Sequence, residues 1–188
     1  KRQKNQLVQA LLDPKSSLEE MGATIEGLAK HANLTTDIAS VSVDAYEEEN
    51  SDAAKHIEEI LEVETKVCDT VASVASSHFP IILGGDHSVG GGTLSGMKSA
   101  NPDKRIGVVW IDAHADLHTP YTTPSGNMHG MPLAMCLGTD NENHAVNTLT
   151  DSEKKLWEAM KAVGGNGPKI LAEDIDVDKL YKEGYMKK

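Results

Sequence analysis

Residues 106–116 read Ile-Gly-Val-Val-Trp-Ile-Asp-Ala-His-Ala-Asp, an apolar run that ends at a carboxylate. Such a run is typical of a buried parallel strand, and open α/β sheets place their sites at the carboxyl ends of these strands. Asp112, His114 and Asp116 alternate, so in an extended chain their side chains leave the same face. Positions i and i+4 of a strand lie roughly 13 Å apart, so the backbone must curl just past Ile111 before both carboxylates can share a metal site.

Two further motifs carry the same residue types. The motif Gly84-Gly85-Asp86-His87-Ser88 follows the apolar run Phe79 to Leu83, which is predicted to be a short buried strand. Its two glycines allow a tight turn at the end of this strand that directs His87 toward the interior. Ser125-Gly126-Asn127-Met128-His129-Gly130 comes next. Carboxylate and imidazole ligands without cysteine favour manganese, with zinc and iron as open alternatives. Together the motifs predict a hydrolytic two-metal centre.

The rest of the chain predicts alternating helices and strands. Helices are expected at 17–33 (opened by a Ser17-x-x-Glu20 capping box), 51–77, 90–101 and 151–163, and strands at 38–45, 79–83 and 105–111. This alternation predicts a doubly wound parallel sheet in a single α/β domain spanning residues 1–188. We expect residues 47–49 to form a solvated linker and residues 138–150 a polar surface loop.

The three motifs resemble those of the ureohydrolase family, and within it those of arginases more than agmatinases. The matching stretches are Gly-Gly-Asp-His-Ser at 84–88, Trp-Ile-Asp-Ala-His-Ala-Asp-Leu-His-Thr-Pro at 110–120 and Ser-Gly-Asn-Met-His-Gly-Met-Pro at 125–132. The resemblance implies a three-layer α/β/α arginase-like fold, present here only in part. It also implies a homo-oligomer, a trimer or hexamer, that serves arginine metabolism.

The resemblance implies a metal centre and a reaction. His87, Asp112, His114 and Asp116 would ligate two Mn²⁺ ions, with Asp112 bridging them and a hydroxide held between the ions as the nucleophile. His129 and Asp116 would be catalytic residues, with His129 as the imidazole that shuttles protons. The implied reaction hydrolyses the guanidinium group of L-arginine to give ornithine and urea.

The resemblance also implies how the substrate is held. Ser125 and Asn127 would bind the α-carboxylate of the amino acid. His118 stands where arginases commonly carry asparagine, and it would donate a hydrogen bond to the same carboxylate. Agmatine or a related guanidino compound is the alternative substrate, which the Ser125-Gly126-Asn127 segment disfavours. A binuclear metallophosphatase is excluded, because the Gly-Asp-x-x-Asp and Gly-Asn-His-Asp/Glu blocks of that class are absent.

Downstream the sequence departs from the family pattern. No Ser-x-Asp-x-Asp stretch follows to complete both metal sites, and the expected guanidinium-binding glutamate is also missing. The acidic run 174–178 lacks the flanking arginine and Pro-Gly-Glu of the arginase substrate motif, so ordinary helix capping explains it better. Residues 179–188 are polar enough to be a frayed end. With four of six expected ligands, two interpretations stay open: an arginase fragment, or a shortened, catalytically silent relative that acts as a subunit.

Composition and charge narrow the classes of partner and the cellular location expected for this protein. The net charge of -11 argues against nucleic acid and anionic membranes as partners and is compatible with a cationic small-molecule substrate. Because no membrane span or secretory signal is indicated, we expect a cytoplasmic protein. Cys68 and Cys136 are expected to be free buried thiols. Four histidines are expected to be ordinary surface or helix residues without nearby acids: His31, His56, His78 and His144.

Overall fold

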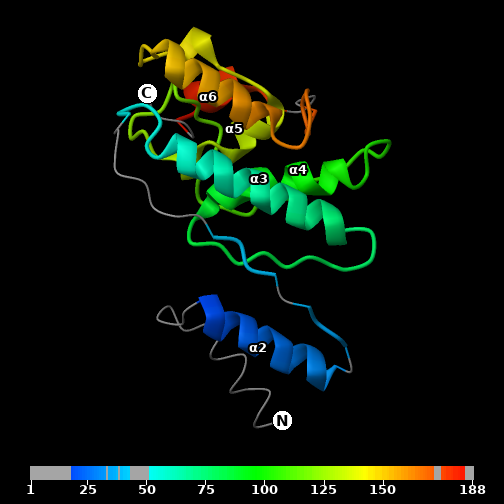
Figure 1. The fold of residues 1–188 in the computed structure, drawn as a ribbon. Helices are drawn as coiled ribbons and strands as arrows, with labels where there is room; N and C mark the ends of the chain where they lie inside the picture. The colour runs from blue at the N-terminus through cyan, green and yellow to red at the C-terminus, as the bar shows by residue number, and fades with distance from the viewer. Residues whose placement is uncertain (1–17, 33, 38, 43–50, 172–174, 185–188) are drawn as a thin grey trace. The chain divides into compact units, whose positions relative to one another are not determined.

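The computed structural model describes residues 18–32, 34–37, 39–42, 51–171 and 175–184. The chain divides into two compact units, one comprising the residues up to 40 with 81–85, the other comprising 41–80 with 86–188. Helix α2 (Leu18–His31) belongs to the first unit, and the other helices labelled in Figure 1 belong to the second. Within the described ranges, no helix has the length and apolar character needed to cross a membrane.

The second unit is built from helices joined by irregular segments. They are α3 (Ile57–Val74), α4 (Gly90–Ser99), α5 (Pro132–Leu137), α6 (Asp151–Ala162) and α7 (Val177–Lys182), with short 3-10 helices η1 (His87–Val89), η2 (Met128–Gly130) and η3 (Glu142–His144). The four predicted helices are confirmed with shorter bounds. The predicted capping residue Ser17 and the linker 47–49 lie outside the described residues.

Helix α3 begins six residues later than predicted. His56, directly before it, has a φ of 57°, a left-handed conformation that a helix does not continue through. Upstream, the Ser51 hydroxyl accepts hydrogen bonds from the N–H groups of Ala53 and Ala54 at 3.2 and 2.9 Å. These local bonds fold the stretch into a turn instead of a helix.

The predicted strands are not formed within the described residues. Residues 79–83 and 105–111, and the described part of 38–45, lie outside any strand. Phe79, Val109 and Ile111 are 89%, 86% and 89% exposed, so the expectation that these segments are buried is wrong. An extended segment becomes a strand only when a neighbour takes up its backbone hydrogen bonds. Half-buried and exposed residues still alternate over 106–111, which is the side-chain pattern of a strand.

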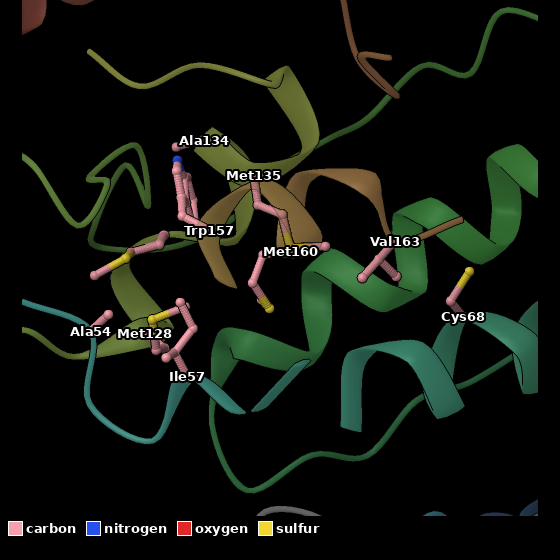
Figure 2. Close-up of a cluster of buried hydrophobic side chains, with 10 residues drawn as sticks. Ala54, Ile57, Cys68, Met128, Ala134, Met135, Trp157, Met160 and Val163 are labelled. Atoms are coloured by element: carbon pink, nitrogen blue, oxygen red, sulfur yellow. The ribbon is translucent and has the colours of Figure 1, made fainter. Parts of the chain in front are cut away.

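The main hydrophobic core lies between α3, α5 and α6 (Figure 2). Met135 of α5 and Trp157 and Met160 of α6 are each at most 2% exposed. The Trp157 Nε1–H donates to Asp140 Oδ1 at 2.9 Å, so the indole is buried with its polar atom satisfied. Both cysteines, predicted to be free and buried, are confirmed as such. This core holds α5 against α3, and α5 directly follows the third sequence motif.

The segment 138–150 is mostly exposed or half-buried, as expected of a surface loop. It also contains η3 and the buried residue Leu149, which is 4% exposed. Two asparagine side chains anchor it to residues 117–123: Asn141 donates to the Leu117 carbonyl at 3.0 Å, and Asn147 donates to the carbonyls of Pro120 and Thr123 at 2.9 and 2.8 Å. These bonds fix the segment that follows Asp116.

Helices α3 and α4 lie side by side and approach closely (Figure 1). A Cβ added at Gly92 or Gly96 would lie 2.5 Å from the carbonyl oxygen of Glu64 or Cys68, so only glycine fits at these two positions. Glu64 is fully buried, and its carboxylate accepts a hydrogen bond from the Gly92 N–H. Burial raises the pKa of the Glu64 carboxyl to about 8, although the Gly92 hydrogen bond opposes the shift.

Glu64 should make the stability of the fold depend on pH. Because its folded-state pKa of about 8 exceeds the ordinary glutamate value of 4.5, the folded chain binds an extra proton between these pH values. The free energy of unfolding should therefore fall as pH rises, by roughly 3 kcal/mol between about pH 5 and pH 8, relative to Glu64→Gln. Urea unfolding at both pH values measures the difference. The exposed Glu58→Gln control should track the wild type, and equal slopes for Glu64→Gln and wild type would contradict the prediction.

Candidate metal centre

The backbone curls directly after Ile111, as the sequence predicts. The His114 N–H donates to Asp112 Oδ1 at 2.8 Å, closing a side-chain turn on the first carboxylate. Asp116 then adopts a φ of 52°, a left-handed conformation that reverses the chain again. The Asp116 carbonyl accepts the N–H groups of Leu133 and Ala134 at 3.1 and 3.2 Å, which ties the turn to the start of α5.

Three predicted ligands converge on one point. His87 Nδ1 lies 2.6 Å from Asp112 Oδ2 and 2.8 Å from Asp116 Oδ2, and all three ligand atoms lie within 4.8 Å of one another. His87 Nδ1 and Asp116 Oδ2 are buried and lie at ion-pair distance, although their angles do not suit a hydrogen bond. Nitrogen and oxygen atoms held about 3 Å apart fit a small cation that binds oxygen and nitrogen at about 2.0–2.2 Å.

The two carboxylates have opposite electrostatic environments. Burial and the neighbouring charge of Asp112 raise the pKa of the Asp116 carboxyl, whose side chain is 3% exposed. The hydrogen bond from the His114 backbone N–H lowers the pKa of Asp112. Two acids this close repel each other when both are ionised, and a bound cation would remove that repulsion.

The position of His87 depends on the start of α4. It lies in η1, which runs into α4 at Gly90, and the turn before it is closed by Asp86 Oδ1, which accepts the N–H and hydroxyl of Ser88 at 2.9 and 2.6 Å. Asp86 therefore acts as a turn residue directly before His87. The His87 ring stacks on Trp110, with ring centroids 4.4 Å apart and an interplanar angle of 24°.

His114 stands apart from the other three predicted ligands. Its side chain is 82% exposed, and its Nδ1 lies 3.2 Å from Asp112 Oδ1. It is not part of the cluster of converging ligand atoms. Asp112 therefore lies between two imidazoles, with one carboxylate oxygen near His87 and the other near His114.

The predicted substrate-binding residues lie on the loop that follows. The Asn127 N–H donates to Ser125 Oγ at 3.2 Å, across Gly126, which has a φ of 72°. His118 is half-buried with its Nδ1 3.2 Å from Thr122 Oγ1, and burial lowers its pKa.

His129, the predicted proton shuttle, sits in η2, close to η1. Its side chain is 52% exposed, and its Nδ1 lies 4.0 Å from Asp86 Oδ2. The ring therefore keeps access to solvent beside the motif that carries His87.

Sequence reasoning assigned no role to Trp110, which forms one wall of the site. The signal was present, because Trp110 and Asp112 share one face of an extended chain. His56 and His144 were expected to lack nearby acids, and this was wrong: His56 Nδ1 lies 3.6 Å from Glu59 Oε1, and His144 Nε2 lies 2.5 Å from Asp178 Oδ1. The His144 ring also stacks on Tyr181 at 4.3 Å. Asp178 is 34 positions away, so no local pattern could reveal the pair.

The acidic run near the end of the chain acts as a helix start. Asp176 Oδ1 accepts the N–H of Lys179 at 2.9 Å and caps α7, so the capping interpretation is confirmed. Asp174 lies outside the described residues. Because α7 extends to Lys182, the expectation of a frayed end from residue 179 is wrong for its first four residues.

The family follows from a comparison with known proteins. A model of the arginase family matches residues 15–177. The chain belongs to the arginase family. It is 39% identical over 122 residues to arginase of Brevibacillus brevis and 38% identical over 127 residues to arginase of Bacillus subtilis strain 168. These matches cover 64% and 67% of this chain but only 35% and 39% of the two relatives.

Solved arginases share this fold. The chain matches a 1.7 Å crystal structure of Bacillus subtilis arginase with a TM-score of 0.62 at 32% identity, covering 80% of this chain and 45% of that structure. For Bacillus caldovelox arginase the TM-score is 0.53 at 36% identity, with coverages of 71% and 39%. The matched region therefore spans less than half the length of these two arginases.

The cluster should bind a divalent cation. We expect His87→Ala and Asp116→Asn each to weaken Mn²⁺ binding roughly tenfold or more, since each removes one of few donors. Titration calorimetry, or the electron paramagnetic resonance signal of free Mn²⁺, measures the affinity. The histidine control His78→Gln should bind Mn²⁺ like the wild type. Unchanged affinity in both cluster variants would rule out this site.

Proposed function

We propose that this chain provides part of an arginase-type manganese hydrolase that converts L-arginine to ornithine and urea. The main support is the geometry of the cluster in a member of the arginase family: His87 Nδ1 lies 2.6 Å from Asp112 Oδ2 and 2.8 Å from Asp116 Oδ2. A net charge of -11 also favours the approach of a cationic guanidinium group over that of an anionic substrate.

The donor set supports two metal positions. His87, Asp112 and Asp116 would hold one Mn²⁺ ion, while the second oxygen of Asp112 and the exposed His114 would contact the other. Carboxylate and imidazole ligands suit manganese, and a cation could bind both His87 Nδ1 and Asp116 Oδ2, which are buried 2.8 Å apart without hydrogen-bond geometry. Two bound cations would lower the pKa of a water molecule enough for it to attack the guanidinium carbon near neutral pH.

The chain's own residues would handle the substrate and the proton. A histidine titrates in the range needed to protonate the departing amine, and the half-exposed ring of His129 lies beside the motif of His87. Ser125 and Asn127, on a loop bent at Gly126, would bind the α-carboxylate together with His118. Agmatine lacks this carboxylate, and so it is the alternative substrate rather than the preferred one.

The rest of the architecture is proposed on the same basis. Residues 79–83 and 105–111 would become strands of a three-layer α/β/α sheet where the remaining part of an arginase fold adjoins them. The exposed side chains of Phe79, Val109 and Ile111 support this, since apolar faces of this kind are normally covered. We propose one incomplete arginase-like domain over residues 1–188, acting in the cytoplasm within a trimer or hexamer.

A catalytically silent subunit is the second candidate. The position of His114 favours this candidate. Its side chain is 82% exposed and does not join the cluster of His87, Asp112 and Asp116, so the second metal position has few converging ligand atoms. Such a subunit would keep one metal position and act through assembly with other chains.

Metal content and urea release separate the two candidates. For the arginase proposal we expect two Mn²⁺ ions per chain at saturation and urea production from L-arginine, because both metal positions are needed to activate water. Inductively coupled plasma analysis of the dialysed protein gives the metal ratio, and a colorimetric assay gives the urea. His87→Ala is the inactive control. One ion per chain, with no urea released, would reject the hydrolase in favour of the silent subunit, and no bound ion would reject both.

Substrate choice can be tested at the carboxylate-binding loop. Ser125→Ala and Asn127→Ala should raise the KM for arginine roughly tenfold, by removing hydrogen bonds to a charged group, and should leave agmatine nearly unaffected. Where turnover is slow, binding of ornithine and of putrescine gives the same comparison. Thr148→Ala, at an exposed position outside the loop, should change neither. An equal effect on both substrates would defeat the assignment.

A further inference from the structure

Glu64 is a buried acid that the proposed chemistry does not use. Its side chain lies in the interface between α3 and α4 and is 0% exposed. One oxygen, Oε2, accepts the N–H of Gly92 in the first turn of α4, and the other, Oε1, has no hydrogen-bond partner among the described residues. An apolar residue of similar size would avoid the cost of desolvating this group. The carboxyl is therefore unexplained by packing alone.

The start of α4 is shaped around this carboxyl. A Cβ added at Gly91 or at Gly92 would lie 2.9 Å from Glu64 Oε2, and at Gly91 it would also lie 2.6 Å from Met135 Sδ. Two successive glycines thus leave space that the Glu64 side chain occupies. The hydrogen bond links the first turn of α4 directly to the middle of α3.

That first turn carries His87. Gly90 opens α4, and its N–H donates to the carbonyls of His87 and Ser88. A Cβ at Gly90 would lie 3.0 Å from Trp110 Cη2 and 3.7 Å from His87 Cδ2, so the stacked rings rest directly on this residue. Only Gly91 separates Gly90 from Gly92, the partner of Glu64.

We propose that Glu64 is a positioning residue, which fixes the first turn of α4 through Gly92 so that His87 Nδ1 faces Asp112 and Asp116. The importance of this position rests on the proposed function, in which His87 is a metal ligand. Burial raises the pKa of the Glu64 carboxyl to about 8, so at neutral pH the group is largely uncharged. Its part is therefore that of a hydrogen-bond acceptor rather than a counter-charge, and glutamine should replace it.

Three variants isolate the hydrogen bond. Glu64→Gln keeps an acceptor oxygen for the Gly92 N–H, whereas Glu64→Met keeps the length of the side chain and removes the acceptor. Val71→Ala is the matched control, because Val71 packs on Gly96 in the same α3–α4 interface but away from the start of α4. Glu64→Asp, which draws the carboxyl back by one methylene, replaces Glu64→Met if that variant does not fold. All measurements are made at a temperature where circular dichroism shows each variant folded.

Two readouts follow His87. In metal-free protein, the ring protons of His87 should show an upfield shift from the stacked Trp110 ring in the NMR spectrum, assigned by comparison with His87→Gln. The same samples are then titrated with Mn²⁺. We expect wild type, Glu64→Gln and Val71→Ala to keep the shift and the affinity. Glu64→Met should lose about half of the shift or more and bind Mn²⁺ roughly tenfold more weakly.

The outcomes distinguish this inference from the proposed function. An unchanged His87 shift in Glu64→Met, or an equal loss in Val71→Ala, would overturn the positioning role, because the interface as a whole would then be responsible. Loss of the shift in Glu64→Gln would overturn the acceptor role. A wild type that binds no Mn²⁺ would reject the proposed function alone, since the metal-free shift still decides whether Glu64 positions His87.

Discussion

The His114 N–H donates to Asp112 Oδ1 at 2.8 Å, and this bond lets an extended segment deliver two carboxylates to one point. Without a turn there, Asp112 and Asp116 would lie roughly 13 Å apart, far beyond the reach of a shared ion. The left-handed backbone of Asp116 completes the reversal. A non-glycine residue in this conformation is uncommon, and functional sites are where such strain is often kept. The geometry of the cluster therefore depends on local backbone chemistry within five residues.

The two halves of the cluster are supported by different parts of the second unit. Asp116 is tied to α5 through its carbonyl, and α5 is held by the core around Trp157. His87 is tied to α4, which packs against α3 through glycine contacts. Because α3 also borders the core, a shift of this helix would move both supports together. The distances within the cluster are thus set by helix packing as well as by the local turn.

Sequence reasoning succeeded where the determining interactions are local. Helical periodicity located α3, α4 and α6, and alternation with the expected curl located the cluster after Ile111. It failed for residues 79–83 and 105–111, because a strand needs a hydrogen-bonding neighbour that a sequence pattern does not supply. Glu64 lies on the apolar face of α3, three residues from both Leu61 and Val67. This polar residue on an apolar face could have indicated a buried carboxyl in the sequence alone. The His144–Asp178 pair joins distant segments and left no such signal.

The cluster is asymmetric in burial, with one well-packed side and one exposed side. On one side Asp116 is 3% exposed and His87 stacks on Trp110, so packing within the protein holds both side chains. On the other side the His114 side chain is 82% exposed, and its Nδ1 lies 3.2 Å from Asp112 Oδ1. Metal affinity depends on the number and fixed orientation of ligand atoms. Under the proposed function, the remaining ligands of the second ion would therefore bind on the open side, next to His114.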